Sequence, residues 1–368
     1  MKSAIGNNVQ LTIFGESHGS AIGMVLNGLA PGIEIDFDYI NKQLDLRKPK
    51  GRISTARKES DTPIVLSGFF EGKTTGTPLC ILFENNNTKS KDYSKTKDIM
   101  RPSHADYSGF VKYHGFNDYR GGGHFSGRLT TPIVCAGAIA KQILESKGIY
   151  IGSHIKRIQD IYDTSFDYVN EETLKEQILE VNKKYFPTLS KDSEEKMLTL
   201  MEEAANNGDS IGGILETAII NVEAGIGEPM FDSIESTLSH YLFSVPAVKG
   251  VEFGLGFEFA NGYGSEVNDS FYYDNDKVKT KTNNNGGING GISNGMPIVF
   301  KTVIKPTPSI YKSQDTINIK DKENTTLQIE GRHDPAIIHR ARIVIDSVSA
   351  LAILDLMCTR YGYTWMEK

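Results

Sequence analysis

The sequence predicts a single α+β domain. Segments with strand character are mostly followed by loops or hairpin-like turns, and the regular strand–helix alternation of a doubly wound sheet is missing from the chain. No internal repeat of about 20–50 residues is evident in the sequence. With 368 residues, 39% of them hydrophobic, the chain can build a substantial core. We therefore expect one domain over residues 1–368.

The first part of the chain is predicted to form four strands and two helices. A helix is expected over residues 36–46, with Asp36 near its start. Another is expected over residues 132–147, because Pro132 suits its first position and Gly148 suits the residue after its end. Apolar residues recur at helical spacing between these two signals. The strand candidates lie at residues 9–14, 22–26, 62–68 and 78–83.

The remainder of the chain mixes helices with half-buried strands. The longest helix candidate is residues 334–357, with Asp334 as its N-cap and Pro335 in first position. Its apolar residues run nearly all round, so it should be buried in the fold or at a subunit interface. Residues 283–295 are rich in glycine and asparagine, and we expect an ordered loop there. Further helices are expected at 171–184, 193–206 and 231–243, and further strands at 210–222, 248–257 and 296–303.

Composition and charge narrow the class of protein. The net charge of −6 argues against a general nucleic-acid binder. The first residues lack the long apolar region of a secretory signal, and no apolar run approaches the roughly 20 residues of a membrane span. Cys80, Cys135 and Cys358 lie in apolar runs without metal-pair spacing, so we expect reduced thiols and no metal site. The protein is expected in the cytoplasm.

The densest chemical signal is a cluster of glycine, histidine and arginine over residues 101–128. Residues 101–107 read Arg-Pro-Ser-His-Ala-Asp-Tyr, and the proline before His104 should hold that histidine on rigid backbone. Residues 120–128 place three consecutive glycines between two arginines, just before the helix at Pro132. Glycine allows close backbone approach, arginine binds anions, and histidine exchanges protons near neutral pH. The cluster predicts a site for a small anionic ligand that undergoes acid–base chemistry.

Other segments carry weaker signals. His18 lies between Ser and Gly in a tight loop directly after a strand, which favours exposure to a cleft over packing in the core. The basic stretch 47–52 fits either a solvated face or an anion-binding loop. Residues 305–309, Lys-Pro-Thr-Pro-Ser, fit either phosphate binding or a rigid strand exit. Residues 331–335 join Arg332 and Asp334 to a helix start, where simple N-capping is the structural alternative.

Several familiar active-site motifs are absent from the sequence. The Gly-Lys-Thr at residues 72–74 lacks the earlier glycine of a phosphate-binding P-loop, since Ser67 stands there. The Gly-Leu-Gly at 254–256 lacks the third glycine of a dinucleotide fingerprint, since Phe259 stands there. Neither a nucleophile elbow nor a histidine pair of the zinc-protease kind is present. These observations exclude the common forms of ATP hydrolysis, NAD binding and metal or serine hydrolysis.

Seven of these segments, taken in order, closely resemble the chorismate synthase family. The resemblance covers nearly the whole chain, and several motifs of this length in fixed order are very specific. The matching segments are residues 15–19, 101–107, 118–123, 208–212, 244–254, 286–295 and 331–335.

The resemblance implies a reaction, a cofactor and a fold. The reaction is the 1,4-anti elimination of phosphate from 5-enolpyruvylshikimate 3-phosphate, which gives chorismate. It requires reduced FMN without net redox change. The implied fold is a β-α-β sandwich in a homotetramer. Two sources of electrons for the flavin stay open, namely NADPH used by this chain or an external flavin reductase.

The resemblance also implies residue roles. His18 would supply a proton to the departing phosphate, His104 would lie at the flavin, and Asp334 would lie near flavin N5. Arg47, Arg52, Arg128 and Arg332 would bind the trianionic substrate. The FMN contacts would be His124, Phe125, Ser126, Pro246, Ala247, Gly290, Lys305, Pro306, Thr307, Pro308, Ser309 and Arg332, with Lys305 and Ser309 at the phosphate.

One position departs from the family pattern. Many members have arginine directly after the triple glycine, where this chain has His124. Two other functions remain alternatives at this stage. One is an FMN-dependent oxidoreductase acting on a phosphorylated small metabolite, and the other is a phosphometabolite-binding protein without catalysis.

Overall fold

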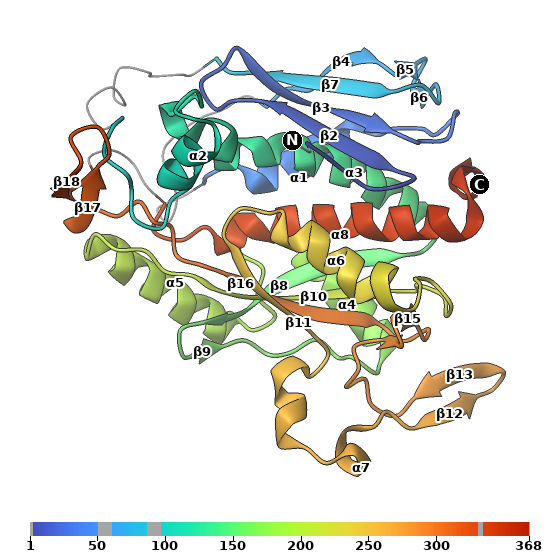
Figure 1. The fold of residues 1–368 in the computed structure, drawn as a ribbon. Coiled ribbons are helices and arrows are strands. Elements are labelled where there is room, and N and C mark those ends of the chain that lie inside the picture. Colours follow the sequence, from blue (N-terminus) through green and yellow to red (C-terminus); the bar gives the residue numbers. More distant parts are fainter. Residues whose placement is uncertain (1–2, 51–60, 87–96, 330–333, 368) are drawn as a thin grey trace.

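The computed structural model describes residues 3–50, 61–86, 97–329 and 334–367. Two antiparallel five-stranded sheets enclose a layer of helices, as Figure 1 shows. The first sheet has the order β1-β2-β3-β7-β4 and the second has the order β11-β16-β10-β8-β9. This arrangement is the β-α-β sandwich that the sequence resemblance implies.

The first sheet comes from the N-terminal part of the chain. Its strands are β1 (Ala4–Ile5), β2 (Gln10–Gly15), β3 (Ala21–Asn27), β4 (Ile64–Ser67) and β7 (Leu79–Glu84), with the small hairpin β5 (Phe69–Phe70) and β6 (Lys73–Thr74) beside them. Helix α1 (Phe37–Arg47) lies beneath this sheet in Figure 1. Asp36 caps the helix, because its side chain accepts hydrogen bonds from the backbone nitrogens of Asp38 and Tyr39. The predicted strands and the predicted start of this helix are therefore confirmed.

The second sheet is built from β8 (Tyr150–Ile158), β9 (Ile161–Tyr162), β10 (Gly213–Ile220), β11 (Val248–Phe253) and β16 (Ile298–Ile304). The sequence did not predict β8, because its residues Gly152, Ser153, His154 and Lys156 interrupt any apolar pattern. Ser153 and His154 are nevertheless wholly buried, since both side chains have polar partners inside the protein. The missed strand is thus stabilised by buried polar contacts that a hydrophobic pattern does not reveal.

Helices α3 (Thr130–Ser146) and α8 (Ile338–Tyr361) form the centre of the sandwich and pack on each other. Gly137 permits their close approach, because a Cβ there would lie 2.2 Å from the Cβ of Ser347. Almost every residue of α8 up to Cys358 is buried. The prediction of a buried helix is therefore confirmed, and its place is inside the fold.

Four predicted helix starts are wrong. The helices predicted at 193–206 and 231–243 begin at Lys191 and Ile234. Helix α3 begins at Thr130, so Pro132 stands third in its first turn, where its missing N–H is still harmless. Helix α8 begins at Ile338 rather than at Pro335, and Asp334 is not its N-cap. The carboxylate of Asp334 pairs with Arg340 instead, and the carbonyl of Pro335 accepts a bond from Ile211 N at 2.8 Å. These tertiary contacts hold residues 334–337 outside the helix.

Among the other elements, one helix (Ile234–Phe243) packs on α8 in the helical layer, and another (Glu171–Val181) packs on β8. The predicted ordered loop at 283–295 contains a hairpin and is confirmed. No helix in the described ranges combines the length and apolarity that a membrane crossing requires. The remaining helices are α2 (Asp106–Lys112), α4 (Glu171–Val181), α5 (Lys191–Asn206), α6 (Ile234–Phe243) and α7 (Gly264–Val267), and the remaining hairpins are β12–β13 (Phe271–Asp274 and Lys277–Thr280), β14–β15 (Ile288–Asn289 and Ile292–Ser293) and β17–β18 (Gln314–Asn318 and Glu323–Leu327).

Candidate active site

The triple glycine forms a turn that both predicted catalytic histidines contact. Gly121, Gly122 and Gly123 have φ angles of 58°, 83° and 55°, a region that only glycine adopts readily. A Cβ on Gly121 would lie 2.3 Å from Cε1 of His18, and a Cβ on Gly122 would lie 3.5 Å from Cε1 of His104. The fold therefore brings two histidines that are far apart in the sequence to the same three-residue turn.

His104 is held by a network from its own segment. Its Nδ1 lies 2.6 Å from Oδ1 of Asp106, and Asp106 in turn receives the side chain of Arg101 through both carboxylate oxygens. Burial tends to raise the pKa of Asp106, but the bonds from Arg101 and His104 outweigh it and hold that pKa far below its usual range. Asp106 is therefore an ionised acceptor at every physiological pH.

His18 lies in the loop after β2, which is anchored to the glycine turn. The backbone N–H of Ser17 donates to Gly123 O at 3.1 Å, and His18 is 8% exposed. His124 is exposed and lies with Nδ1 2.9 Å from Gly15 O. Because a carbonyl only accepts, this nitrogen of His124 carries hydrogen and pins the loop to the turn.

The two FMN candidates after His124 have contacts of their own. The ring of Phe125 covers α2, where a Cβ on Gly109 would lie 2.7 Å from its Cε2. The hydroxyl of Ser126 accepts a bond from Arg128 N at 3.3 Å and caps the short 3₁₀ turn Gly127–Leu129. Both side chains therefore hold the glycine turn in place.

Arg47 and Arg128 meet at a buried carboxylate that sequence reasoning missed. Arg47 Nη2 lies 2.7 Å from one oxygen of Asp61, and Arg128 Nη1 donates to the other. Arg128 also bonds Thr131 Oγ1 and Asn85 Oδ1, both at 3.1 Å. Burial tends to raise the pKa of Asp61, but the two guanidinium charges outweigh it and lower that pKa. Two predicted substrate arginines are thus brought together at one carboxylate.

Asp334 connects this cluster to the segment 305–309. Its carboxylate pairs with Arg340, whose Nε donates to Arg47 O at 2.7 Å. Its backbone carbonyl accepts a bond from Thr307 Oγ1 at 2.9 Å. The predicted catalytic aspartate therefore lies between the arginine cluster and the predicted phosphate segment.

Lys305 joins three predicted cofactor segments. Its Nζ donates to Ser103 O at 2.8 Å, beside His104, and its backbone N–H donates to Ala247 O at 2.9 Å. Partial burial and the neighbouring charge of Lys249 lower the pKa of Lys305. Two close cations make this place favourable for an anion such as a phosphate.

Gly290 is the predicted cofactor residue that the structure does not bring to this place. It lies in the turn between β14 and β15, and the neighbouring Gly291 O accepts a bond from Ile234 N at the start of α6. Pro246 and Ala247 follow the other end of α6, and ten helical residues span about 15 Å. Gly290 is therefore separated from Ala247 by roughly the length of that helix.

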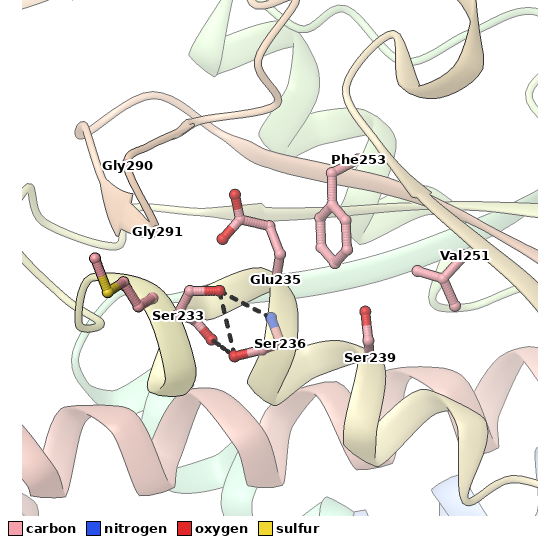
Figure 2. Close-up of a pocket in the computed structure, with 9 residues that line it drawn as sticks. Ser233, Glu235, Ser236, Ser239, Val251, Phe253, Gly290 and Gly291 are labelled. Carbon is pink, nitrogen blue, oxygen red and sulfur yellow. Dashed lines mark hydrogen bonds between the residues drawn. The ribbon is translucent and has the colours of Figure 1, made fainter.

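The surface beside Gly290 is a separate open pocket of about 590 Å³, shown in Figure 2. Ser233, Ser236 and Ser239 recur at every third residue along α6 on one side of it, and Phe253 of β11 lies opposite. The carboxylate of Glu235 points between them toward Gly290 and Gly291 (Figure 2). The pocket is lined by both polar and apolar side chains and is open to solvent, whereas the arginine cluster is buried.

Arg52 and Arg332 lie outside the described residues. Within the described ranges, no group of three or more His, Cys, Asp or Glu side chains could hold a metal ion.

The chain matches the family model described as chorismate synthase over residues 9–358. It is 47% identical over 355 residues to the chorismate synthase of Pyrococcus abyssi, covering 96% of this chain and 97% of that protein. It is 46% identical over 366 residues to the chorismate synthase of Methanobrevibacter smithii, covering 99% and 98%. The chain belongs to the chorismate synthase family.

The fold agrees with this assignment. A crystal structure of chorismate synthase superposes with a TM-score of 0.76 at 25% sequence identity, and the match covers 97% of this chain and 94% of that one. Membership of the chorismate synthase family confirms three predictions from the sequence, namely the family, the α+β sandwich and a lyase activity.

The chorismate synthase motifs contain some of the residues that sequence reasoning overlooked. Asp106 lies two residues after His104 in a quoted motif, so its pairing with that histidine had a local signal. Asp61 and Arg340 had no such signal, because their partners lie 14 to 293 residues away. Only the fold reveals that they hold the predicted substrate residues.

Proposed function

We propose that this chain catalyses the 1,4-anti elimination of phosphate from 5-enolpyruvylshikimate 3-phosphate, with reduced FMN bound beside the substrate. The observation that carries the proposal is the meeting of His18 and His104 at one glycine turn, within a chain that matches the chorismate synthase family over nearly its full length. Two histidines beside a turn that carries no side chains suit a reaction in which a phosphate leaves and a proton moves.

The residues present fit a flat, phosphorylated cofactor. The glycine turn offers backbone without side chains, and Lys305 with Lys249 provides cationic charge for a phosphate. Reduced FMN, when bound, supplies an electron transiently to assist departure of phosphate and regains it, so the reaction has no net redox change. The residues proposed to hold it are His124, Phe125, Ser126, Pro246, Ala247, Arg332 and residues 305–309. Gly290 lies about one helix length from Ala247, so it would contact the same cofactor only if the ligand extends that far or if Gly290 comes from a neighbouring subunit.

The substrate carries a phosphate and two carboxylates, and we assign them to the arginines. Arg47 and Arg128 are fixed by Asp61, so their donors are oriented before the substrate arrives. Arg52 and Arg332 are proposed to complete this set. Two guanidinium groups side by side suit an anionic substrate better than a neutral metabolite.

Proton transfer is assigned to three side chains. His18 donates a proton to the departing phosphate, and His104 presents Nε2 to the flavin side of the glycine turn. Asp334, held by Arg340, assists removal of the substrate C6 hydrogen. Each group is positioned by a neighbour in the structure, as efficient general acid–base catalysis requires.

An oxygen-free assay with chemically reduced FMN and 5-enolpyruvylshikimate 3-phosphate tests the proposal. We expect phosphate and chorismate in equal amounts while the flavin ends reduced. A net oxidoreductase would oxidise flavin in proportion to turnover, and a binding protein would release no phosphate. His18→Ala should lose roughly 10²-fold or more of the activity, whereas His240→Ala on the exposed side of α6 should lose none.

One further reaction decides whether the electrons for FMN come from NADPH through this chain or from an external reductase. Oxidised FMN with NADPH and this chain alone should stay inactive if an external flavin reductase is required. Turnover without added reductase would instead show that the chain uses NADPH directly.

A homotetramer, a single domain over residues 1–368 and a cytoplasmic location are also proposed. The largest hydrophobic cluster joins residues of both sheets, which supports one domain. Ile64, Leu66 and Phe70 at the edge of the first sheet are 38% to 67% exposed, as expected of a face that another subunit covers. The three cysteines are unpaired thiols, which suits a reducing compartment. Light scattering of the purified chain tests the tetramer.

A further inference from the structure

We infer that Asp106 is a positioning residue for His104, which it holds in the tautomer that presents Nε2 to the glycine turn, and that Arg101 fixes Asp106 in turn. The inference rests on the proposed function, because it concerns how His104 exchanges a proton. Its test nevertheless reads the imidazole directly, so it does not depend on turnover.

The tautomer follows from the contact between His104 and Asp106. An ionised carboxylate only accepts hydrogen bonds, so the 2.6 Å contact with Oδ1 places hydrogen on Nδ1 of His104. In the neutral ring the lone pair is then on Nε2. That nitrogen faces Gly122, where a Cβ would lie 3.6 Å away. Glycine at this position keeps the reactive nitrogen accessible.

The carboxylate of Asp106 is itself fixed on all sides. Oδ1 accepts from His104 Nδ1 and from Arg101 Nη2 at 2.8 Å, and Oδ2 accepts from Arg101 Nε at 2.7 Å and from Arg101 N at 3.1 Å. Two donors on each oxygen leave the group little freedom to rotate. The position of Asp106 is secured further because it begins α2, and Gly109 of that helix packs under Phe125 from the glycine turn.

Arg101 limits the electrostatic effect of this arrangement. Its guanidinium balances the charge of Asp106, and its Nη2 lies 3.1 Å from Nδ1 of His104. Both nitrogens carry hydrogen in the assigned tautomer, so this contact opposes further protonation of the ring. Lys305, whose Nζ bonds Ser103 O, adds positive charge from the facing segment, with Lys249 behind it. Arg101 therefore fixes the carboxylate that orients His104.

The test is a nitrogen-15 NMR titration of the full-length chain labelled at histidine, with the His104 signals assigned by their loss in His104→Gln. In the unmodified chain we expect the neutral ring to show Nδ1–H and an unprotonated Nε2. In Asp106→Asn the side-chain amide can present N–H to Nδ1, so we expect the Nε2–H tautomer to gain population and the titration midpoint to move to lower pH. In Arg101→Gln the tautomer should stay unchanged and the midpoint should move to higher pH.

The opposite directions separate positioning from general damage. Asp106→Glu should retain part of the original tautomer, and Asp192→Asn, which alters an exposed Asp–Lys pair at the start of α5, should change nothing. The proposed lyase activity of Asp106→Asn should fall by about 10²-fold or more, as when a catalytic histidine is held in the wrong tautomer. An unchanged tautomer in Asp106→Asn would overturn the inference even if the chain is an active lyase. An inactive unmodified chain would instead overturn the proposed function and leave the tautomer assignment in place.

Discussion

Two histidines of this chain, His104 and His154, each lie with Nδ1 on an aspartate, and they differ in what the other nitrogen meets. Nε2 of His104 faces the glycine turn, and the residue is partly exposed. Nε2 of His154 lies 2.9 Å from Glu216, and the residue is wholly buried. One aspartate orients a reactive ring, whereas a second carboxylate turns the ring into a structural cation.

The charge of His154 follows from geometry. Both ring nitrogens lie 2.9 Å from carboxylate oxygens, so both carry hydrogen and the ring is an imidazolium. Burial tends to lower its pKa, but the bonds to Asp163 and Glu216 outweigh burial and raise it. Glu216 also accepts from Tyr168 OH and Phe166 N, so the cation connects β8, β10 and the segment before α4.

The difference teaches how to separate the two roles. A buried charge that is fully enclosed by partners cannot reach a substrate, and its removal lowers the free energy of unfolding. A charge with one partner and one accessible atom can exchange a proton, and its loss appears in the rate. Stability and activity measured on the same variant therefore distinguish the two roles.

The largest expected effect is on folding. His154→Gln leaves two buried carboxylates without their cation, and we expect the free energy of unfolding to fall by about 3 to 5 kcal/mol. Denaturation in urea measures it, with His240→Gln as the exposed control. A loss below about 1 kcal/mol, the value of an ordinary surface pair, would contradict the structural role assigned to His154.

The reverse pattern is expected for His104→Gln. Activity should fall by roughly 10²-fold, because the group facing the glycine turn is lost. The free energy of unfolding should change by less than about 1 kcal/mol, since the site is partly exposed and Asp106 keeps its bonds from Arg101. The two are measured by phosphate release and by urea denaturation. A large loss of stability with little loss of rate would place His104 with His154 instead.

Asp61 has the opposite arrangement of charges to His154, because here one buried carboxylate lies between two guanidinium groups. Asp61→Asn leaves Arg47 and Arg128 buried around a neutral amide, and we expect a loss of about 2 to 4 kcal/mol, near the range measured for broken buried pairs. Added phosphate should restore more stability to this variant than to the unmodified chain, because the two arginines have lost a negative charge and attract an external anion more strongly. Melting curves with increasing phosphate test this, with sodium chloride at equal ionic strength as the control. Equal stabilisation of both proteins would show that the cluster is closed to external anions.

Much of this site could be predicted from the sequence, and the remainder had a physical reason for being hidden. Short-range signals were reliable, such as Asp36 as a helix cap and the glycine turn beside His104. The start of α8 was wrong because Asp334 has a tertiary partner, Arg340, which overrides its capping preference.

Long-range polar pairing was the general limit of the sequence. Strand β8 was missed because its polar residues are buried against partners 62 to 193 residues away. Nothing in the sequence showed which carboxylates enclose His154. The same limit concealed Asp61, so the sequence pointed to Arg47 and Arg128 as candidates and not to the carboxylate that lies between them.

The smallest expected effect is the change in the free energy of unfolding with pH. We expect it to depend on His154 and not on His104. The pKa of His154 is raised in the folded protein, so its contribution is complete below the unfolded value of about 6.5 and is lost as pH rises through the folded value. Asp163, whose pKa is lowered to about 2, acts at the other end, where its contribution is lost only in strong acid.

We therefore expect the free energy of unfolding to decline on the alkaline side by at most about 1.4 kcal/mol per pH unit for this one proton. Urea denaturation between about pH 6 and pH 10 should show this slope in the unmodified chain and in His104→Gln, and show less of it in His154→Gln. If His154→Gln keeps the full slope, another group titrates there. The imidazolium would then not be the cation that holds β8 to β10.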